Sequence, residues 1–326
     1  MKVLVIRLGS LGDVILTTPV VSALKKKYPE CAVTVLTKEE YGGVFKDNPD
    51  VAEVIELKKD RSSFLQVVAL GDSLDRRFDY VVDLHLNLRS FILRTLTGGV
   101  VLKYSKQIFR RRLLVLNSYL PSPLRFFKAE SSQVSVIENY FKALKTLGVE
   151  YAGEKPYLLF KKRPKKSALL GLAPGGKKFT KRWPVEKFAE LCDKASAKGF
   201  EIRLFGGRED SAVAEKIKSI TKASLQDFTG KTDVLETASL MSECSVVVAN
   251  DSAPMHIASA ADTRVIALFC ATTAAFGFAP VYAGNKVLDY ELPCKPCGLH
   301  GRNRCRLNNF ECAEKITVQQ VLELLK

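Results

Sequence analysis

The sequence predicts an α/β protein made of two doubly wound, Rossmann-like domains. Short apolar runs alternate with segments of helical spacing along most of the chain. The alternation breaks once, between Val149 and Ser167, where two prolines, Gly153 and a run of Lys and Arg indicate little core. The same alternation then restarts. We therefore expect an N-terminal domain at residues 1–160 and a C-terminal domain at residues 161–326, and the last helix could pack back onto the first domain.

The first half has the pattern of repeated strand–helix units. Residues 2–6 form an apolar run typical of a buried parallel strand, and residues 14–27 carry apolar side chains at helical spacing. Gly148 would end the last helix of this half. By the same criteria, strands are expected at residues 2–6, 32–36, 52–57, 79–84 and 101–104, and helices at residues 14–27, 39–46, 64–75, 89–96 and 131–147.

The second half repeats this pattern. Two of its apolar runs open onto loops of chemical interest, because residues 200–205 precede Gly206-Gly207 and residues 245–249 precede Asn250. Strands are expected at residues 168–173, 200–205, 245–249 and 264–269, and helices at residues 185–198, 210–220, 232–242 and 255–261. In open parallel sheets, ligands bind beyond the carboxyl ends of the strands. Two such sheets facing one another would bring both sets of loops to a shared cleft.

Composition places the chain among globular proteins. Its 326 residues exceed a typical single domain, and 47% hydrophobic with 26% charged residues is ordinary for an enzyme. The first apolar run stops at Arg7 without a small-residue cleavage site after it, and no apolar stretch reaches the length of a membrane span. We expect a cytosolic protein whose thiols are reduced.

The net charge of +15 is distributed unevenly. Residues 84–129 and 155–185 contain no Asp or Glu. Such a field attracts phosphates on nucleic acid, anionic lipid or a nucleotide-linked substrate, although a solvated basic surface is the alternative for any single lysine. The cations of the first stretch are Arg89, Arg94, Lys103, Lys106, Arg110, Arg111, Arg112, Arg125 and Lys128.

The first strand leads directly into Gly9, Ser10, Gly12 and Asp13. The glycines let the backbone turn sharply, and Asp13 falls at or near the start of a helix. Its carboxylate could cap the helix or project into the crevice beyond the strand ends. The spacing is not the G-x-G-x-x-G dinucleotide fingerprint, and the acidic residue that would hold a ribose about 20 positions later is missing, which argues against a dehydrogenase.

A second polar loop, residues 250–256, follows the strand at 245–249. Asp251 and Ser252 are good N-cap residues, and Pro254 suits the first turn of a helix. The start of a helix offers free backbone N–H groups and the positive end of its dipole, so this loop could cradle a diphosphate or be a plain cap. His256 would lie about one turn into the helix, near the loop or packed against the sheet.

Four of the eight cysteines gather near the C-terminus, close to His300. A C-x-x-C pair followed by two further cysteines has the ingredients of a structural zinc site, but reduced thiols in a cytosolic loop need no partner. We expect no bound metal, with structural zinc as the alternative. The cysteines are Cys294, Cys297, Cys305 and Cys312.

Taken together and in order, four motifs resemble glycosyltransferase family 9, the ADP-heptose:lipopolysaccharide heptosyltransferases. They are Asp13 after its glycine loop, residues 181–184 (KRWP), residues 205–209 (FGGRE) and residues 250–256 (NDSAPMH). The resemblance covers nearly the whole chain and implies a GT-B fold, with two Rossmann-like domains around a cleft. It implies transfer of heptose from ADP-heptose to the inner core of lipopolysaccharide, with inversion at the anomeric carbon.

The resemblance also implies roles for individual residues. Asp13 would deprotonate the acceptor hydroxyl, Lys181 would hold the diphosphate, and Glu209 would bind the ribose hydroxyls of ADP. The loop of Asp251, Ser252 and Ala253 would meet the sugar and phosphates, with His256 nearby. Ala253 departs from the family's usual Gly, which leaves the donor sugar more open than the reaction. On the acceptor side, residues of the first glycine loop and arginines of the basic stretch are predicted to bind the acceptor: Gly9, Ser10, Gly12, Arg89, Arg110, Arg111 and Arg112.

The residues agree with this implication on two points. The sequence has no Asp-x-Asp pair, the usual clamp for a nucleotide-bound divalent metal, so no cofactor is expected and Lys181 and helix dipoles would offset the charge of the leaving group. The basic stretch 84–129 suits an anionic, Kdo-bearing lipid. Its arginines with Phe109, Phe126 and Phe127 would suit docking on the cytoplasmic face of the inner membrane, although these phenylalanines could equally be core.

Two alternatives stay open from the sequence. The first is transfer of another sugar from a nucleotide donor on the same fold. The second is a non-catalytic protein that binds anionic lipid or nucleic acid through its basic face. The absence of an RNP1-type motif argues against nucleic acid.

Overall fold

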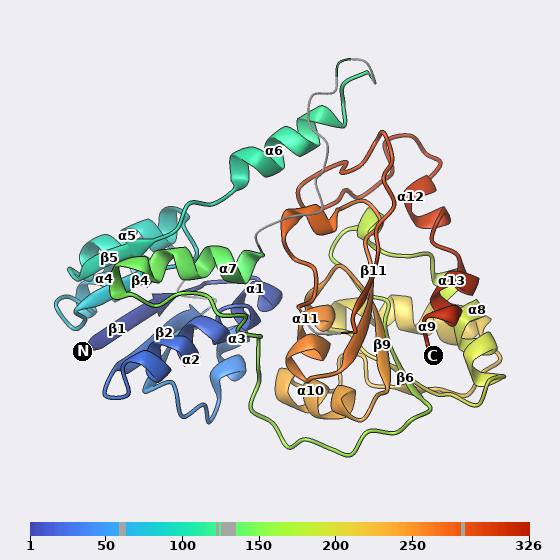
Figure 1. Ribbon diagram of the computed structural model, residues 1–326, viewed down its shortest axis with the longest axis horizontal. Helices are drawn as coiled ribbons and strands as arrows, with labels where there is room; N and C mark the ends of the chain where they lie inside the picture. The colour runs from blue at the N-terminus through green and yellow to red at the C-terminus, as the bar shows by residue number, and fades with distance from the viewer. Residues whose placement is uncertain (59–62, 122–123, 125–134, 282–283) are drawn as a thin grey trace. The chain divides into compact units, whose positions relative to one another are not determined.

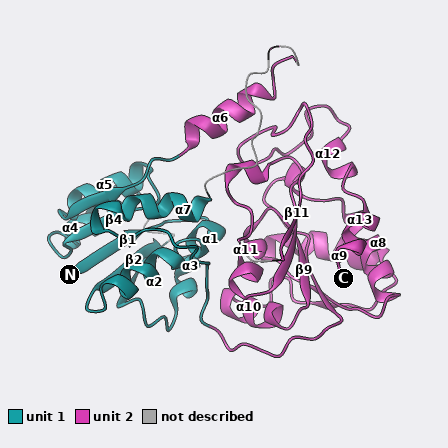
Figure 2. Cartoon of the chain, viewed as in Figure 1, with its two compact units in different colours: residues 1–106, 134–159 teal, residues 107–133, 160–326 magenta. Residues whose placement is uncertain are grey.

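The computed structural model describes residues 1–58, 63–121, 124, 135–281 and 284–326, and it divides into two compact units (Figures 1 and 2). Unit 1 comprises residues 1–106 and 134–159, and unit 2 comprises residues 107–133 and 160–326. Each unit is a parallel α/β sheet with helices on both faces, as the alternating pattern predicts. Residues 107–133 precede the last helices of unit 1 in sequence but group with unit 2.

The sheet of unit 1 has five parallel strands in the order β3-β2-β1-β4-β5. The central strand β1 pairs on both sides, with Ile6 opposite Leu36 on β2 and opposite Asp83 on β4. Strand β1 is an unbroken apolar run because both faces of the sheet are covered. The strands are β1 (Lys2–Ile6), β2 (Ala32–Lys38), β3 (Glu53–Leu57), β4 (Tyr80–Asp83) and β5 (Val100–Lys103).

Helices cover both faces of this sheet. On one face, Leu4 and Ile6 share a buried cluster with Val67 and Leu93 of the helices α4 and α5. The helices and 3₁₀ turns (η) of unit 1 are α1 (Leu11–Ile15), α2 (Thr18–Lys27), α3 (Glu39–Gly42), η1 (Gly43–Phe45), α4 (Phe64–Ser73), α5 (Leu88–Leu96), α7 (Val136–Phe141) and η3 (Lys142–Leu147).

Several predicted helices differ from the observed ones. The helix expected at 39–46 is α3 followed by the 3₁₀ turn η1. The single helix expected at 14–27 is divided into α1 and α2, because Pro19 has no N–H to donate and its ring crowds the carbonyl four residues earlier. The helix expected at 131–147 is an α-helical turn followed by a 3₁₀ segment, and residues 131–134 lie outside the described residues. As predicted, Gly148 ends it, with a φ of +61°.

The sheet of unit 2 has six parallel strands in the order β11-β10-β9-β6-β7-β8. The four strands predicted from the sequence form its centre, and the short edge strands β8 and β11 were not predicted. The strands are β6 (Leu169–Ala173), β7 (Glu201–Leu204), β8 (Gln226–Asp227), β9 (Val246–Asn250), β10 (Arg264–Leu268) and β11 (Lys286–Leu288).

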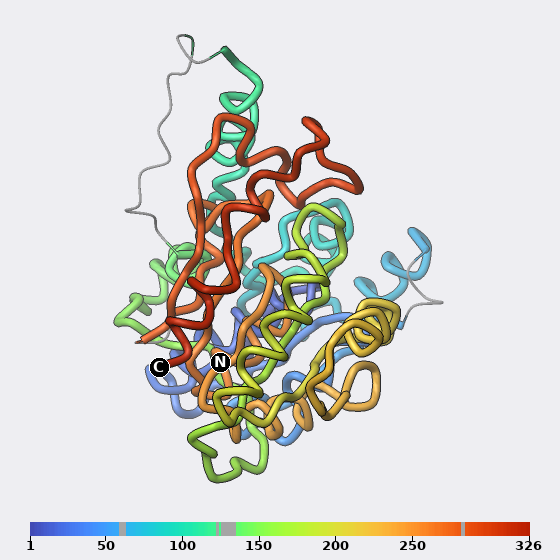
Figure 3. Tube along the Cα trace, turned by 90° about the vertical axis from the view of Figure 1, so that its right-hand side faces the viewer, coloured from blue at the N-terminus to red at the C-terminus, as the bar shows by residue number. Residues whose placement is uncertain are grey.

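The helices of unit 2 close its core, and the last helix, α13, packs against α8 of the same unit. Trp183, which lies just before α8, is 1% exposed and donates from its indole N–H to the Ile316 carbonyl at 2.9 Å. This bond ties the segment before α13 to the start of α8. Figure 3 shows this end of the chain in red. The helices and turns are α6 (Ile108–Asn117), η4 (Phe179–Lys181), α8 (Val185–Ser196), η5 (Arg208–Asp210), α9 (Ser211–Ile220), α10 (Val234–Ser242), α11 (Ala253–Ala260), η6 (Ala274–Phe276), α12 (Glu311–Glu314) and α13 (Val318–Glu323).

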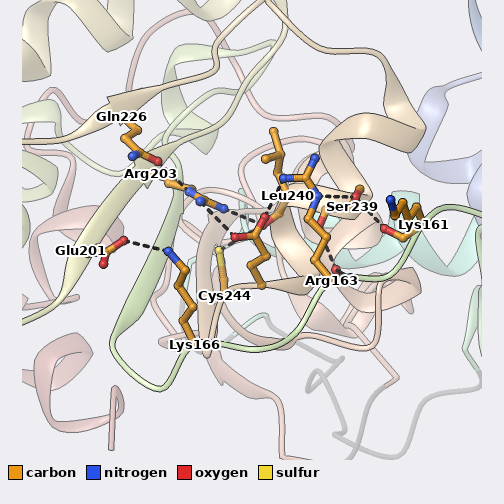
Figure 4. Close-up of polar contacts among 11 residues, drawn as sticks. Lys161, Arg163, Lys166, Glu201, Arg203, Gln226, Ser239, Leu240 and Cys244 are labelled. Atoms are coloured by element: carbon orange, nitrogen blue, oxygen red, sulfur yellow. Dashed lines mark hydrogen bonds and ion pairs between the residues drawn. The ribbon is translucent and has the colours of Figure 1, made fainter.

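An ionic cluster around the buried Glu243 joins the segment that enters unit 2 to the helix α10 (Figure 4). Glu243 follows α10, and its two carboxylate oxygens accept from Arg203 at 3.1 Å and from Arg163 at 2.9 Å. Arg203 also donates to Gln226 at 2.9 Å, and Arg163 to Ser239 at 3.0 Å. The run of basic residues after the boundary is therefore partly structural.

Both sheets reverse their strand order at the same point of their topology. In unit 1, β1 lies between β2 and β4, and in unit 2, β6 lies between β7 and β9. The crevice at such a switch point, beyond the carboxyl ends of the strands, is where open α/β sheets bind ligands. The loops after β1, β4, β6 and β9 are thus the places to look for a site.

In the described part of the chain, no helix is long and apolar enough to cross a bilayer.

Candidate functional site

The loop after β1 brings Asp13 to the switch point of unit 1. Gly9 has a φ of +143°, and a Cβ there would lie 2.9 Å from the ring of Tyr41, so both the turn and the close packing require glycine. Helix α1 then begins, with Gly12 buried within it and Asp13 in its first turn. The sharp turn predicted from the two glycines is confirmed at Gly9.

Asp13 both caps the helix and carries an ion pair. Its Oδ2 accepts from the Ser10 backbone N–H at 3.0 Å and from the Ser10 hydroxyl at 2.8 Å, and its Oδ1 lies 2.7 Å from the guanidinium of Arg7. Burial by itself would raise the pKa of Asp13. Arg7 and the Ser10 hydrogen bonds outweigh burial, and the pKa of Asp13 is lowered. The carboxylate is therefore ionised at neutral pH.

Arg7, which continues strand β1, is held rigidly. Its side chain is 8% exposed, one guanidinium N–H donates to the Leu84 carbonyl after β4, and the guanidinium lies 5.5 Å from the ring centre of Tyr140. Because Arg7 is held in place, the Asp13 carboxylate that pairs with it also has a fixed orientation at the carboxyl end of β1. Arg7 could not be predicted as a site residue from the sequence, because a cation at a strand end has no visible partner until the fold brings one near.

His85 is a second residue at this site that was not predicted from the sequence. It follows β4 on the other side of the switch point, and among the described residues its buried Nδ1 has no hydrogen-bond partner. Burial, then the nearby Arg7 and Lys106, lower the pKa of His85 to about 3, so its imidazole is neutral at pH 7. One of only three histidines directly after a predicted strand was the available signal.

An open pocket lies beside this edge, at the start of α5. Arg94 lines it and also pairs with the buried Asp83 at 3.0 Å. Arg89, predicted as an acceptor-side residue from the basic stretch, is exposed on α5 but does not line the pocket. The lining residues are Leu86, Asn87, Leu88, Phe91, Arg94 and Lys103. Two cations among apolar side chains suit a ligand that is both anionic and partly apolar.

In unit 2, Lys181 and Asp251 meet at the switch point. The Lys181 Nζ lies 2.7 Å from Asp251 Oδ2, and the Thr272 hydroxyl donates to the same oxygen at 2.7 Å. Asn250, at the end of β9, accepts from the Trp183 backbone N–H at 3.0 Å and donates to the Pro174 carbonyl at 2.7 Å. The structure therefore brings together two motifs that are about 70 residues apart in the sequence.

Asp210 connects the loops that follow β6 and β7. Its carboxylate accepts from the backbone N–H of Gly176 at 3.2 Å and of Gly207 at 3.1 Å, and a Cβ on Gly175 would lie 2.1 Å from it. Burial is the largest cause that raises the pKa of Asp210. Its neighbour Glu209, which the family resemblance indicated as a site residue, is exposed at the same edge. Asp210 instead holds the loops in place.

Helix α11 begins at this edge, as predicted. Ser252 is its N-cap residue, Ala253 is the first helical residue, and both are partly exposed. His256 is 5% exposed, and its ring lies edge-on to Phe278 with ring centres 6.5 Å apart. Of these predicted donor-side residues, His256 is the one that packs into the interior, while the start of the helix stays accessible.

The predicted acceptor-side arginines Arg110, Arg111 and Arg112 lie on α6, which groups with unit 2. The guanidinium of Arg111 lies 4.8 Å from the ring centre of Phe278 in that unit. The other residues predicted for docking, Arg125, Phe126, Phe127 and Lys128, lie outside the described residues.

The four C-terminal cysteines line one small cavity of unit 2, together with Thr180 and Phe310. All are free thiols, and burial raises the pKa of Cys312 to about 12. Across the described ranges, no group of three or more His, Cys, Asp or Glu side chains is placed to hold a metal ion. The cysteines are Cys294, Cys297, Cys305 and Cys312.

The chain has two Rossmann-like units, and each holds charged groups at the switch point of its parallel sheet. This arrangement is typical of the class of proteins that bind nucleotide-linked ligands at the switch point. Residues 67–305 match glycosyltransferase family 9 (heptosyltransferase), and the chain belongs to this family. It is therefore a glycosyltransferase.

Similar proteins agree with this assignment. The chain is 29% identical over 301 residues to lipooligosaccharide heptosyltransferase 2 of Haemophilus influenzae, and the alignment covers 84% of each chain. A glycosyltransferase family 9 structure from Veillonella parvula matches with a TM-score of 0.80 and 23% identity, covering 99% of this chain and 97% of that one. The ADP-heptose lipopolysaccharide heptosyltransferase II of E. coli matches with a TM-score of 0.73 and 21% identity, covering 100% and 97%. These solved structures confirm the predicted GT-B fold class.

Proposed function

We propose that this protein transfers heptose from ADP-heptose to a hydroxyl of the lipopolysaccharide inner core, at the cytoplasmic face of the inner membrane. Membership of the family and the names of its relatives support the substrates. The observation that carries the mechanism is the Asp13 carboxylate, kept ionised and fixed in direction by Arg7 and Ser10 at the switch point of unit 1.

In the proposed reaction Asp13 is the general base. It removes the proton of the acceptor hydroxyl as the hydroxyl oxygen attacks the anomeric carbon of the heptose. The new bond forms on the face opposite the departing ADP, the bond from that carbon to the phosphate oxygen breaks, and the configuration inverts. The proton stays on Asp13 and is released to solvent afterwards.

Unit 2 would hold the donor. Lys181, oriented by Asp251, would face the diphosphate, and the N–H groups at the start of α11 would add the positive end of the helix dipole. Both offset the negative charge that grows on ADP as it leaves, which is electrostatic stabilisation of the transition state. Glu209, exposed at the same edge, would accept hydrogen bonds from the ribose hydroxyls. No metal ion has a place in this scheme.

The test is a donor screen with Kdo-lipid A and its heptosylated form as acceptors, read by mass spectrometry. We expect a mass gain of one heptose from ADP-heptose and the inverted anomer by NMR. Asp13→Asn should lower kcat by about 10²–10⁴-fold while ADP affinity stays unchanged. Ser10→Ala, which keeps the carboxylate, is the matched control and should lose far less.

Three outcomes would overturn parts of the proposal. Unchanged turnover in Asp13→Asn would remove Asp13 as the base. A retained anomeric configuration would exclude single displacement. Transfer from another nucleotide sugar with none from ADP-heptose would favour the alternative donor on the same fold.

A further inference from the structure

Helix α6 exposes one apolar face. Phe109 is 80% exposed, Leu113 37% and Leu116 57%. At 100° per residue these three positions lie within an arc of about 60° on the helix. Three large apolar side chains aligned on one exposed stripe differ from the scattered single residues that any protein surface carries. We call Phe109, Leu113 and Leu116 the α6 stripe.

The opposite face of α6 is fixed to unit 2. Leu114 is buried, and the guanidinium of Arg111 lies over the ring of Phe278. Just after the helix, Ser118 donates to the Pro296 carbonyl at 2.9 Å, and the guanidinium of Arg306 lies 3.9 Å from the ring centre of Tyr119. Figures 1 and 3 both show the end of α6 beside the orange-red loop of this unit. The helix thus has a defined packed side, and the stripe is its outer side.

The charged residues of α6, and of the chain on either side of it in the sequence, have one sign. Arg112 falls on the exposed side of α6 and Arg110 at its flank, and the sequence has no Asp or Glu from residue 84 to residue 129. A helix with a strongly polar, basic part and an apolar stripe lies in the plane of a membrane interface, where the arginines meet anionic headgroups.

We propose that the α6 stripe, with Arg110 and Arg112, is the surface by which this protein docks on an anionic lipid bilayer. The apolar side chains enter the boundary between headgroups and acyl chains, and the helix does not cross it. The inference rests on the proposed function in one respect: a lipid-linked acceptor favours a bilayer over a protein as the occupant of this face.

The experiment measures binding of the full-length chain to vesicles, with no donor or acceptor present. Vesicles of phosphatidylethanolamine with phosphatidylglycerol should bind the protein, and vesicles of phosphatidylcholine should not. The triple variant Phe109→Ser, Leu113→Ser and Leu116→Ser should bind the anionic vesicles on the order of tenfold more weakly or worse. Ile220→Ser, which removes an exposed apolar residue at the end of α9, is the matched control and should bind as the wild type.

A spectroscopic measurement tests the same surface in a variant that keeps an aromatic side chain at position 109, so that misfolding of the triple variant does not decide the result. The chain has a single tryptophan, Trp183, which is buried. Phe109→Trp therefore adds a reporter on the stripe, and its emission should shift to the blue and be quenched by lipid-borne quenchers on anionic vesicles. Wild-type binding by the triple variant, or no response of the Phe109→Trp emission, would overturn the proposal.

Further outcomes separate this inference from the proposed function. With a deacylated, water-soluble acceptor the triple variant should keep wild-type turnover, and with acceptor in vesicles its turnover should fall. If no heptose is transferred in any assay but the triple variant loses vesicle binding, the proposed function fails and the docking surface stands. A wild-type dimer that the triple variant makes monomeric, with no vesicle binding, would show that the stripe binds a second copy and would overturn the proposal.

Discussion

The ion pair between Arg7 and Asp13 should set the lower pH limit of catalysis. Burial raises the pKa of Asp13, and Arg7 with Ser10 more than reverses that effect. Arg7→Met removes a positive charge 2.7 Å from the carboxylate and leaves the burial in place. The pKa of Asp13 must then rise, so a larger fraction of the base is protonated and inactive in acidic buffer.

The size of the effect follows from the geometry. An opposite charge about 4 Å away is worth about 4 kcal/mol at an effective dielectric constant of about 20, which is an upper limit for a carboxylate that water can reach. Measured effects of such neighbours are about 1–3 pH units. The acidic limb of the kcat–pH profile should therefore move upward by about 1–3 units in Arg7→Met.

The assay is the pH dependence of kcat with saturating donor and acceptor. Turnover on the alkaline plateau should stay near that of the wild type, because the base is fully ionised there in both proteins. Arg7→Lys keeps the positive charge and should leave the acidic limb close to its original place. An unmoved acidic limb in Arg7→Met, or an equal loss of kcat at every pH in a folded variant, would refute the idea that Arg7 acts through the ionisation of Asp13.

Two further predictions concern unit 2. Lys181→Met should lower kcat/KM for the donor by about 10–100-fold, which corresponds to the loss of one charge-assisted hydrogen bond. Lys178→Met, at the nearby surface, is the control and should keep the wild-type value. Equal values of kcat/KM for the two variants would contradict a role of Lys181 at the diphosphate. Glu243→Gln should lower the free energy of unfolding, followed by urea and circular dichroism, by about 3 kcal/mol, because Arg203 would stay buried without a carboxylate. Burial raises the pKa of Glu243, but the effect of Arg203 and Arg163 outweighs burial, so the pKa is lowered in the folded protein. The contribution of Glu243 to the free energy of unfolding is therefore present above the pKa of the unfolded chain and is lost as the pH falls through the pKa of the folded protein. The free energy of unfolding of Glu243→Gln should lack this acid-dependent loss. The same pH dependence in the variant as in the wild type would contradict the role of the Glu243 carboxylate.

The sequence predicted the parallel strands well because of where they lie. Strands covered on both faces are unbroken apolar runs, as at Val3–Ile6 and Val246–Ala249, and such runs can be recognised in the sequence without a structure. Each run is followed by glycine or a polar residue where the chain leaves the sheet, so Asp13 and Asp251 could be placed at strand ends. The edge strands β8 and β11 were missed because short, partly exposed pairings leave little apolar pattern.

Helices with one exposed side were harder to predict. The stretch that forms α6 was not predicted as a helix. It was interpreted as a basic stretch that, with Phe109, would suit docking on a membrane, because three consecutive arginines interrupt its apolar pattern and leave no clear core face. Its packed side becomes visible only beside Phe278 and Pro296, about 160–190 residues later in the chain.

For the site, the residues could be named from the sequence but their partners could not. Asp13 was seen as either a cap or a site residue, and the fold shows a cap whose second oxygen meets Arg7. His85 and Asp210 carry no motif of their own, because their role depends on which loops the sheet order brings together. Composition and periodicity determine where strands and their polar ends occur along the chain. Which polar ends become neighbours, and so which charges are paired, oriented or held ionised, was decided by the strand order β3-β2-β1-β4-β5 and its counterpart in unit 2.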